Sequence, residues 1–341
     1  MQTEATPCYI IAEAGVNHNG DVDIAIKLIA AAKKAGADAI KFQTFHAEDL
    51  VTPDAPKASY QAEQTGADET QFAMLQKLEL DHAAHQQLML ECTRQGIVFL
   101  STPFDLQSAR FLVDAGMSKI KVPSGELTNL PFIQSLALMG PPLIVSTGMA
   151  TLAEVQAAVA AIRSAAPDRP VTLLQCTSNY PADPADANLL AMVTMGKACN
   201  TPVGYSDHVP DNTVAFAAVA LGATLVEKHL TLDRGMEGPD HAASIEPETF
   251  EALVRGIRTV ESALGDGIKQ PAASEQNTAT VARRSIVAAR ELSSGTILTE
   301  ADLTFRRPGT GMPPSAIQQV LGRTLLRDLP PKTLLAESDL K

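Results

Sequence analysis

Eight short apolar runs recur along the first three quarters of the chain, separated by longer segments of mixed polarity. The runs are nearly continuous in apolar residues, which is typical of strands buried on both faces of a parallel sheet. Parallel strands need a crossover connection, usually a helix. The pattern therefore predicts repeated β/α units, with strands within residues 8–14, 37–43, 96–102, 119–125, 142–148, 171–177, 202–207 and 224–230.

The segments between the runs carry the spacing and the end signals of amphipathic helices. One of them begins at Asp21, places Ile24 and Leu28 on one face and ends at Gly36. Another covers residues 152–165. Roughly eight β/α units in a chain of this length match a (β/α)8 TIM barrel, and a doubly wound open sheet is the competing α/β fold.

Polar residues stand at the ends of most of the predicted strands. Enzymes with a TIM barrel take their catalytic side chains from many strand ends at one rim. The distribution therefore favours the barrel over the open sheet. The residues concerned are Glu13, Lys41, Gln43, Thr102, Lys121, Ser124, Ser146, Tyr180, His208 and His229.

The chain divides into a TIM-barrel catalytic domain at 1–265, a linker at 266–282 and a small β-rich domain at 283–341. The linker is predicted because this stretch is polar, contains Gly and Pro and has no period. The last segment alternates apolar and polar residues around turn signals and holds nine Lys/Arg against six Asp/Glu. Within the barrel, residues 44–80 exceed the length of one helix and predict an insertion over the barrel mouth.

Composition and charge exclude several classes of function. The net charge of -12 argues against nucleic-acid and anionic-membrane binding, since both need a basic surface. No apolar stretch approaches the roughly 20 residues that span a bilayer. The four cysteines have no CxxC spacing, so reduced core cysteines in a cytoplasmic protein are expected rather than a zinc ribbon.

Two histidines, in GYSDH and VEKHL, each follow an apolar strand. Neutral imidazole binds transition metals, and neighbouring barrel strands would bring His208 and His229 within reach of one ion. A lone histidine is more often structural, but two at matched strand ends favour a metal pair. With two protein ligands, water or substrate must complete the coordination shell, which is typical of a catalytic metal.

Two lysines lie inside apolar runs, Lys41 in KFQTF and Lys121 in KVPSGE. An unpaired buried ammonium is costly, so each must reach the rim or pair with an anion. Rim hydroxyl groups would add hydrogen-bond donors for a phosphate and a carboxylate. The chain has neither a P-loop nor a GxGxxG motif, so nucleotide binding has little support.

Three acidic residues are candidates for acid–base roles. Glu13 interrupts an apolar strand, a position where a carboxylate is disfavoured without a function. Glu126 and Asp240 lie beside glycines or rim strands, and a structural salt bridge is the alternative for Glu126. Ser146 in VSTGMA lacks the GxSxG elbow of a hydrolase nucleophile.

The ordered set of motifs resembles the bacterial N-acetylneuraminate (sialic acid) synthase family, which includes legionaminic acid synthases. The resemblance covers nearly the whole chain, and RRSIVA and RRPGTG resemble the family's C-terminal antifreeze-like (SAF) domain. The family implies a TIM barrel, a linker and an SAF domain that swaps across a homodimer. The barrel motifs are IAEAGVNHNGD, KFQTF, STPFD, KVPSGEL, VSTGMA, QCTSNYP, GYSDH, EKHLTLD and EGPDHAASIEP.

The resemblance also implies roles for individual residues. The phosphoenolpyruvate ligands would be Lys41, Thr102, Lys121, Ser124, Ser146 and Ser206. Glu13 would be the catalytic carboxylate, with Glu126 near the reacting centre. The sugar would contact Gln43, Tyr180, Asp240 and, from the other protomer, Arg307. His208 and His229 would hold a divalent metal; Mn²⁺ is expected, with Mg²⁺ and Co²⁺ as alternatives.

The acceptor is an N-acylated hexosamine whose identity is open at this point. N-acetylmannosamine, giving N-acetylneuraminate, is the first choice. The alternative is 2,4-diacetamido-2,4,6-trideoxymannose, giving N,N'-diacetyllegionaminate, and a pseudaminate synthase is third. Two other classes compete, a noncatalytic carbohydrate-binding protein and a metal-dependent hydrolase. The carbohydrate-binding protein would not need two rim histidines and two strand lysines in this order, and the hydrolase would form its products without phosphoenolpyruvate.

Overall fold

The computed structural model describes residues 6–66 and 68–341. Residues 1–5 of the predicted barrel domain and residue 67 of the predicted insertion lie outside the described residues. The chain forms two compact units, Met1–Gly265 and Asp266–Lys341, and each is described by itself. Among the helices that the structure describes, none is long and apolar enough to cross a membrane.

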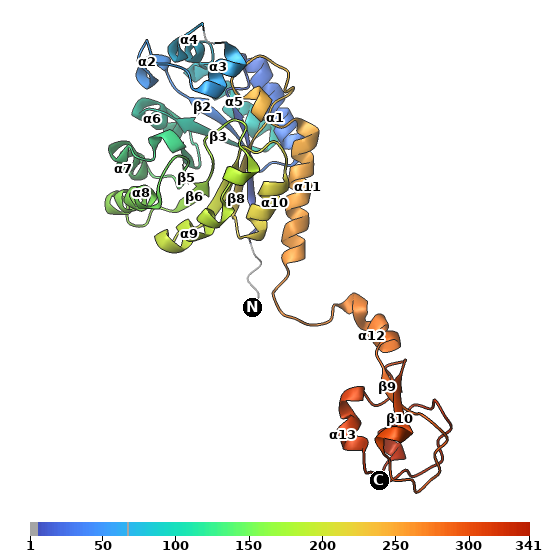
Figure 1. Ribbon diagram of the computed structural model, residues 1–341. Helices are drawn as coiled ribbons and strands as arrows, with labels where there is room; N and C mark the ends of the chain where they lie inside the picture. The colour runs from blue at the N-terminus through green and yellow to red at the C-terminus, as the bar shows by residue number, and fades with distance from the viewer. Residues whose placement is uncertain (1–5, 67) are drawn as a thin grey trace. The chain divides into compact units, whose positions relative to one another are not determined.

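The first unit is a barrel of parallel strands, as predicted (Figure 1). The strand order is β3-β2-β1-β8-β7-β6-β5-β4, and β3 contacts β4 to complete the ring. This closure excludes the open doubly wound sheet. The strands are β1 (Tyr9–Gly15), β2 (Ala39–Thr44), β3 (Val98–Pro103), β4 (Ile120–Val122), β5 (Leu143–Ser146), β6 (Val171–Gln175), β7 (Val203–Asp207) and β8 (Leu225–His229).

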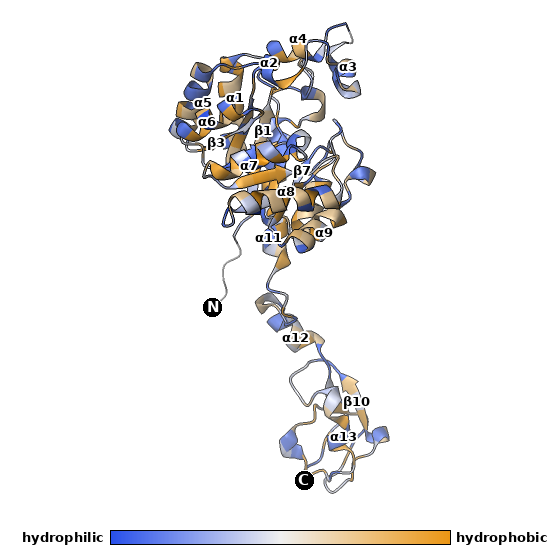
Figure 2. Cartoon of the chain, turned by 90° about the vertical axis from the view of Figure 1, so that its left-hand side faces the viewer, coloured by the Kyte–Doolittle hydropathy of each residue, from blue (hydrophilic) through white to orange (hydrophobic). Residues whose placement is uncertain are grey.

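Helices follow the strands and surround the barrel. The first has the predicted ends: the Asp21 side chain accepts hydrogen bonds from the backbone N–H groups of Asp23 and Ile24, and Gly36 closes it with φ 87°. In Figure 2 the barrel strands are apolar, and the helices around them are of mixed hydropathy. The long helices are α1 (Val22–Ala35), α5 (His82–Gln95), α6 (Leu106–Asp114), α7 (Leu130–Leu138), α8 (Leu152–Ala165), α9 (Leu189–Cys199), α10 (Thr213–Ala220) and α11 (Pro247–Leu264).

The strand register brings chemically active residues together at the carboxyl ends of the strands. Glu13 on β1 pairs in register with Lys41 on β2 on one side and with His229 on β8 on the other. Ser206 on β7 pairs with Glu227 on β8. Below this rim the strands form an apolar core, and the four cysteines are free and buried, as expected.

The long connection after β2 contains three short helices before α5. These are α2 (Ala47–Leu50), α3 (Ser59–Thr65) and α4 (Gln71–Gln76). Leu50, Tyr60, Gln61 and Met74 from this insertion line the pocket at the barrel mouth. The insertion therefore forms one wall of that pocket, in the region where the sequence predicted it.

The predicted linker is not wholly irregular. A short 3-10 turn, Ala273–Glu275, leads into helix α12 (Gln276–Ala282). None of these residues is buried, so the helix has no apolar face for a sequence pattern to reveal. That absence of a period is why the segment was predicted as a linker without helix.

The C-terminal unit has its own apolar core, which includes Ile286, Leu298, Leu325 and Leu335. Its described residues contain one antiparallel pair, β9 (Ser285–Ala288) with β10 (Leu303–Arg306), and a short helix, α13 (Ile317–Val320). The other pairings are isolated bridges. The unit thus has the small antiparallel sheet of the predicted β-rich domain, together with isolated β-bridges.

An internal repeat of 37 residues organises this unit. LSSGTILTEADL at 292–303 matches LPPKTLLAESDL at 329–340. The halves exchange backbone hydrogen bonds reciprocally: Leu292 donates to the carbonyl of Leu329 and accepts from its N–H. Arg290 donates to Asp302, and Arg327 donates to Asp339 in the same way. The unit is therefore a pseudo-twofold structure.

The repeat predicts a stabilising substitution. Lys332 has φ 67°, whereas the equivalent residue of the first half is Gly295 with φ 87°. The left-handed region is unfavourable for a residue with a Cβ, so Lys332→Gly is expected to raise the free energy of unfolding by about 0.5–1 kcal/mol. Urea unfolding of the full chain measures the change.

Gly295→Ala is the matched control for this prediction. A Cβ at Gly295 would meet nothing within 4 Å, so backbone strain alone should lower stability there by about 1 kcal/mol. Loss of stability in Lys332→Gly would contradict the strain argument.

Candidate active site

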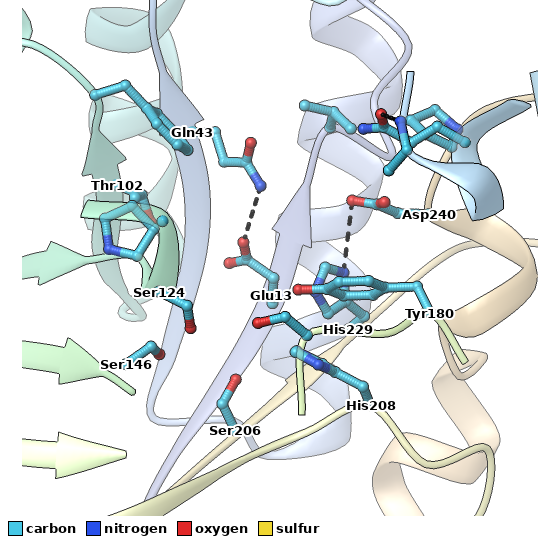
Figure 3. A pocket seen from close by; sticks show the side chains of 18 of the residues that line it. Glu13, Gln43, Thr102, Ser124, Ser146, Tyr180, Ser206, His208, His229 and Asp240 are labelled. Atoms are coloured by element: carbon cyan, nitrogen blue, oxygen red, sulfur yellow. Dashed lines mark hydrogen bonds and ion pairs between the residues drawn. The ribbon is translucent and has the colours of Figure 1, made fainter. Parts of the chain in front are cut away.

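A pocket of about 470 Å³ opens at the carboxyl end of the barrel strands. The predicted site residues of the barrel unit all line it, and several point toward one another in Figure 3. These residues are Glu13, Lys41, Gln43, Thr102, Lys121, Ser124, Glu126, Ser146, Tyr180, Ser206, His208, His229 and Asp240. The structure thus brings together residues from all eight β/α units.

A buried cluster of two lysines and two glutamates forms the floor of the pocket. The Lys41 Nζ lies 2.7 Å from Glu13 Oε2 and 3.6 Å from Glu227 Oε2. The Lys121 Nζ lies 3.3 Å from Glu227 Oε1. Each of the four side chains is at most 5% exposed, so their charges interact in a poorly screened environment.

Glu227 was missed by the sequence analysis. It lies two residues before His229 on β8, and side chains at i and i+2 of a strand point to the same face. The signal was therefore present in VEKHL. It was obscured because the neighbouring Lys228 makes the segment appear as a short charged run rather than as an alternating strand end.

The two glutamates differ in their acidity. Burial raises the pKa of Glu13 to about 7, although Lys41 lowers it in part. Burial also disfavours the charged form of Glu227, but the charges of Lys121 and Lys41 outweigh this effect and lower its pKa to about 2. Glu13 can therefore exchange a proton near neutral pH, whereas Glu227 remains a carboxylate.

Hydroxyl groups surround the cluster on the side of β3 to β7. Thr102 accepts a hydrogen bond from Lys41 at 3.0 Å, and Ser206 donates to Glu227 at 3.0 Å. Ser124 Oγ accepts from the Gly148 N–H at 3.0 Å. The buried Ser146 Oγ has no hydrogen-bond partner among the described residues. A buried polar atom without a partner is costly, so Ser146 is available to a ligand.

The imidazole rings of His208 and His229 lie 5.5 Å apart between centroids. Burial lowers the pKa of His208 to about 4 and that of His229 well below its usual range, so both rings are neutral at pH 7. His208 Nδ1 lies 2.6 Å from the Thr177 carbonyl, which fixes its proton there and leaves a lone pair on Nε2. The buried Nδ1 of His229 has no hydrogen-bond partner among the described residues.

These properties fit a divalent transition metal. The described parts of the chain contain no group of three or more His, Cys, Asp or Glu arranged to hold a metal by themselves. The donor set is thus two neutral imidazoles, with the carboxylate of Asp240 3.9 Å from His229. Such a set leaves coordination positions for water and substrate.

A second buried lysine network holds the loop that carries His208. Lys228 Nζ donates to Asp207 Oδ2 at 2.5 Å and to the carbonyls of Val209 and Asp211 at 2.6 and 2.8 Å. These three bonds use all three ammonium donors. Lys228 is therefore a structural residue that fixes the loop after β7.

Tyr180 and Gln43 complete the side of the pocket that faces the histidines. The Tyr180 ring lies 4.2 Å from the His208 ring and 5.0 Å from the Tyr60 ring. Gln43 Nε2 lies 3.5 Å from Glu13 Oε1. Burial raises the pKa of Asp240 to about 6. These groups can donate and accept hydrogen bonds around a polyhydroxylated ligand.

Comparison with known proteins identifies the family. The NeuB family model matches residues 28–269, and the SAF domain model matches residues 283–341. The chain belongs to the NeuB family. This confirms the resemblance and the expectation of a phosphoenolpyruvate-dependent synthase of the sialic-acid type.

Individual NeuB-family relatives cover almost the whole chain. The N,N'-diacetyllegionaminic acid synthase of Campylobacter jejuni is 44% identical and covers 96% of this chain and 98% of its own. The synthase of the same name from Legionella pneumophila is 46% identical and covers 96% and 93%. The crystal structure of the sialic acid synthetase from Leptospira borgpetersenii has a TM-score of 0.70 at 33% identity and covers 80% and 90%.

Two predicted site residues of this NeuB-family chain differ from the others in their surroundings. Glu126 lines the pocket but is only half-buried, and its Oε2 accepts a hydrogen bond from Asn129 at 2.8 Å. Arg307 belongs to the C-terminal unit, where it follows β10 and is exposed. Its assignment to the sugar, and the swapped homodimer that this assignment requires, stay predictions.

The buried histidines predict that acid destabilises the NeuB-family fold. Burial lowers the pKa of His18 from its ordinary value of 6.5 to about 4. Between these two pH values His18 binds a proton in the unfolded chain but not in the folded chain. Its contribution to stability is therefore present above about pH 6.5 and is lost as the pH falls toward 4. Between pH 7 and 5 the loss is expected to reach about 2 kcal/mol.

His18→Asn tests this expectation, because an amide oxygen can replace Nδ1 as acceptor for the Gly20 N–H. The difference in unfolding free energy between wild type and variant should shrink by about 2 kcal/mol from pH 7 to pH 5. A difference in unfolding free energy that stays constant from pH 7 to pH 5 would refute the lowered pKa of His18.

Proposed function

We propose that this protein condenses phosphoenolpyruvate with 2,4-diacetamido-2,4,6-trideoxymannose to give N,N'-diacetyllegionaminate and phosphate. The observation that carries the proposal is the 44% and 46% identity, along nearly the whole chain, to two N,N'-diacetyllegionaminic acid synthases. The sialic acid synthetase structure is 33% identical. These identities support the alternative acceptor of the sequence analysis over N-acetylmannosamine, its first choice.

The donor half of the site is the lysine and hydroxyl cluster. The ammonium groups of Lys41 and Lys121 supply the positive charge that favours an anion in this cluster. We assign the phosphate and carboxylate of phosphoenolpyruvate to Lys41, Lys121, Thr102, Ser124, Ser146 and Ser206. Charge-assisted hydrogen bonds of this kind are short and strong, and they hold C3 of the enol toward the histidine side.

The acceptor half is formed by the histidines, Tyr180, Gln43 and Asp240. A divalent cation, with Mn²⁺ as first choice, would be held by His208 and His229 and would polarise the aldehyde oxygen of the open-chain sugar. C3 of phosphoenolpyruvate then attacks the aldehyde carbon. Gln43 and Asp240 orient the sugar, which limits the reacting atoms to one geometry.

The two glutamates have different tasks in this scheme. Attack by C3 leaves a cationic centre at C2, and the permanently ionised Glu227 stabilises that charge. Water adds to C2, and Glu13, with a pKa of about 7, accepts its proton and returns it to the former aldehyde oxygen, which becomes the new hydroxyl group. The tetrahedral intermediate expels phosphate, whose leaving oxygen remains paired with the lysines.

The apolar part of the pocket supports the diacetamido acceptor. Leu50, Val51, Met74, Leu75 and Leu78 of the insertion all line it. A 2,4-diacetamido-2,4,6-trideoxy hexose presents three methyl groups, two of them on acetamido substituents and one at C6. N-acetylmannosamine presents one methyl and a C6 hydroxyl. Burying additional methyl groups against an apolar wall is favourable.

Phosphate release with each sugar tests the proposal directly. Wild-type enzyme, phosphoenolpyruvate and Mn²⁺ should release phosphate with the diacetamido sugar at a kcat/KM at least about tenfold above that with N-acetylmannosamine, as expected for two additional buried methyl groups. Omission of either substrate is the control. A preference for N-acetylmannosamine would overturn the proposed acceptor and restore the sialic acid synthase.

A further inference from the structure

Two residues of the insertion, Tyr60 and Gln61 on α3, line the pocket next to the sugar side. The Tyr60 ring lies 5.0 Å from the ring of Tyr180. Tyr180 in turn lies 4.2 Å from His208 and 5.4 Å from His229. A row of rings therefore leads from the imidazole pair, where the proposed function places the aldehyde carbon, to the insertion.

The length of the sugar places its far end beside this part of the wall. An open-chain hexose bound by C1 near the histidines has C4 three bonds away, about 4 Å at roughly 1.5 Å per bond. A substituent on C4 reaches further by a similar distance. The Tyr180 ring lies between the Tyr60 ring and the histidines. The distance of Tyr60 from the histidines therefore matches the distance of the C4 substituent from C1.

The chemistry of the pair suits an acetamido group. Gln61 Oε1 accepts hydrogen bonds from the Ala58 N–H at 3.1 Å and from Gln71 Nε2 at 3.3 Å. The amide oxygen is thus engaged by the protein, and Nε2 is the polar atom of the Gln61 side chain that is left for a ligand in the pocket that Gln61 lines. An acetamido carbonyl accepts such a bond, and its methyl packs on an aromatic ring such as that of Tyr60.

We propose that Tyr60 and Gln61 contact the acceptor beyond C3 and set its selectivity at C4, favouring an acetamido group over a hydroxyl. This inference rests on the proposed function, because it assigns the second acetamido group of that acceptor to these residues. It makes Gln61 a hydrogen-bond donor to the carbonyl and Tyr60 an apolar face for the methyl.

The test uses substitutions that keep the fold of α3. Gln61→Glu retains an oxygen acceptor for the Ala58 N–H, because Glu and Gln both serve at this position of a helix cap. The substitution replaces the Nε2–H donors by a carboxylate oxygen. Tyr60→Leu removes the ring and leaves an apolar side chain. Gln64→Glu is the matched control, because Gln64 is an exposed residue of the same helix.

The measurement is kcat/KM for the diacetamido sugar and for N-acetylmannosamine, with full-length enzyme, phosphoenolpyruvate and Mn²⁺. Gln61→Glu and Tyr60→Leu should each change the ratio of the two values at least about tenfold, through KM of the diacetamido sugar. KM for phosphoenolpyruvate and the melting temperature should stay at the wild-type values. Gln64→Glu should leave the ratio unchanged.

The outcomes separate this inference from the proposed function. The wild-type ratio alone decides which acceptor is preferred. The ratios of the variants decide whether Tyr60 and Gln61 set selectivity, whichever sugar the wild type prefers. Unchanged ratios, or equal losses with both sugars, would overturn the inference.

Discussion

Lys41→Met is expected to lower the free energy of unfolding by about 3–5 kcal/mol, the cost of breaking a buried ion pair by removing one partner. Lys41 lies between Glu13 and Glu227, both of which are buried. Its loss leaves two carboxylates with only Lys121 to offset them. The same substitution should abolish measurable phosphoenolpyruvate binding, which isothermal titration calorimetry can follow alongside urea unfolding.

Two further variants separate stability from substrate binding. Lys41→Met combined with Glu13→Gln removes one unpaired carboxylate and should recover part of the lost stability without restoring phosphoenolpyruvate binding. Lys228→Met removes an equally buried lysine that does not line the pocket. It should cost similar stability while the protein still binds phosphoenolpyruvate. Wild-type affinity in Lys41→Met would rule out the assigned donor site.

Replacing His229 by alanine is expected to abolish Mn²⁺ binding and to lower kcat by at least about 10³, a loss typical of removing a main source of transition-state charge stabilisation. His208→Ala should behave in the same way, because neither imidazole can hold the ion alone. Electron paramagnetic resonance of free Mn²⁺ measures binding without relying on turnover. Phosphoenolpyruvate binding should persist, since the lysine cluster is unchanged.

His85→Gln provides the control for a buried histidine outside the pocket. His85 is fully buried and its Nε2 lies 2.8 Å from Thr44 Oγ1. This variant should lose stability but keep the wild-type Mn²⁺ affinity. Undiminished Mn²⁺ binding in both His208→Ala and His229→Ala would disprove the metal pair.

The barrel could be predicted from the sequence because its strands are buried on both faces. A run such as PLIVSTG lacks the alternation of apolar and polar residues that a half-exposed strand shows. Strand β5 (Leu143–Ser146) lies within this run. Helix ends were equally clear where a cap residue marks them, as at Asp21 and Gly36. By contrast, α12 has no buried residue, so no periodic pattern of apolar residues marked it.

The candidate site could be predicted only in part. Strand-end residues such as Lys41 and His208 were identified because a polar residue in an apolar run is conspicuous. Tyr60 and Gln61 were not, because they lie in an insertion whose path no period determines. We propose that the preference for the acceptor depends on that insertion, and the strand motifs therefore identified the donor more firmly than the sugar.

The reciprocal hydrogen bonds of the C-terminal unit have a consequence for its assembly. The backbone N–H of Lys332 donates to the carbonyl of Ala288, and the N–H of Gly295 donates to the carbonyl of Leu325. The repeat of 37 residues relates Gly295 to Lys332 and Ala288 to Leu325, so the two bonds are equivalent. Each half therefore completes its backbone with the other and has no separate core. Two peptides cut between the halves should be unfolded alone and should fold on mixing, as complementing fragments of one split domain.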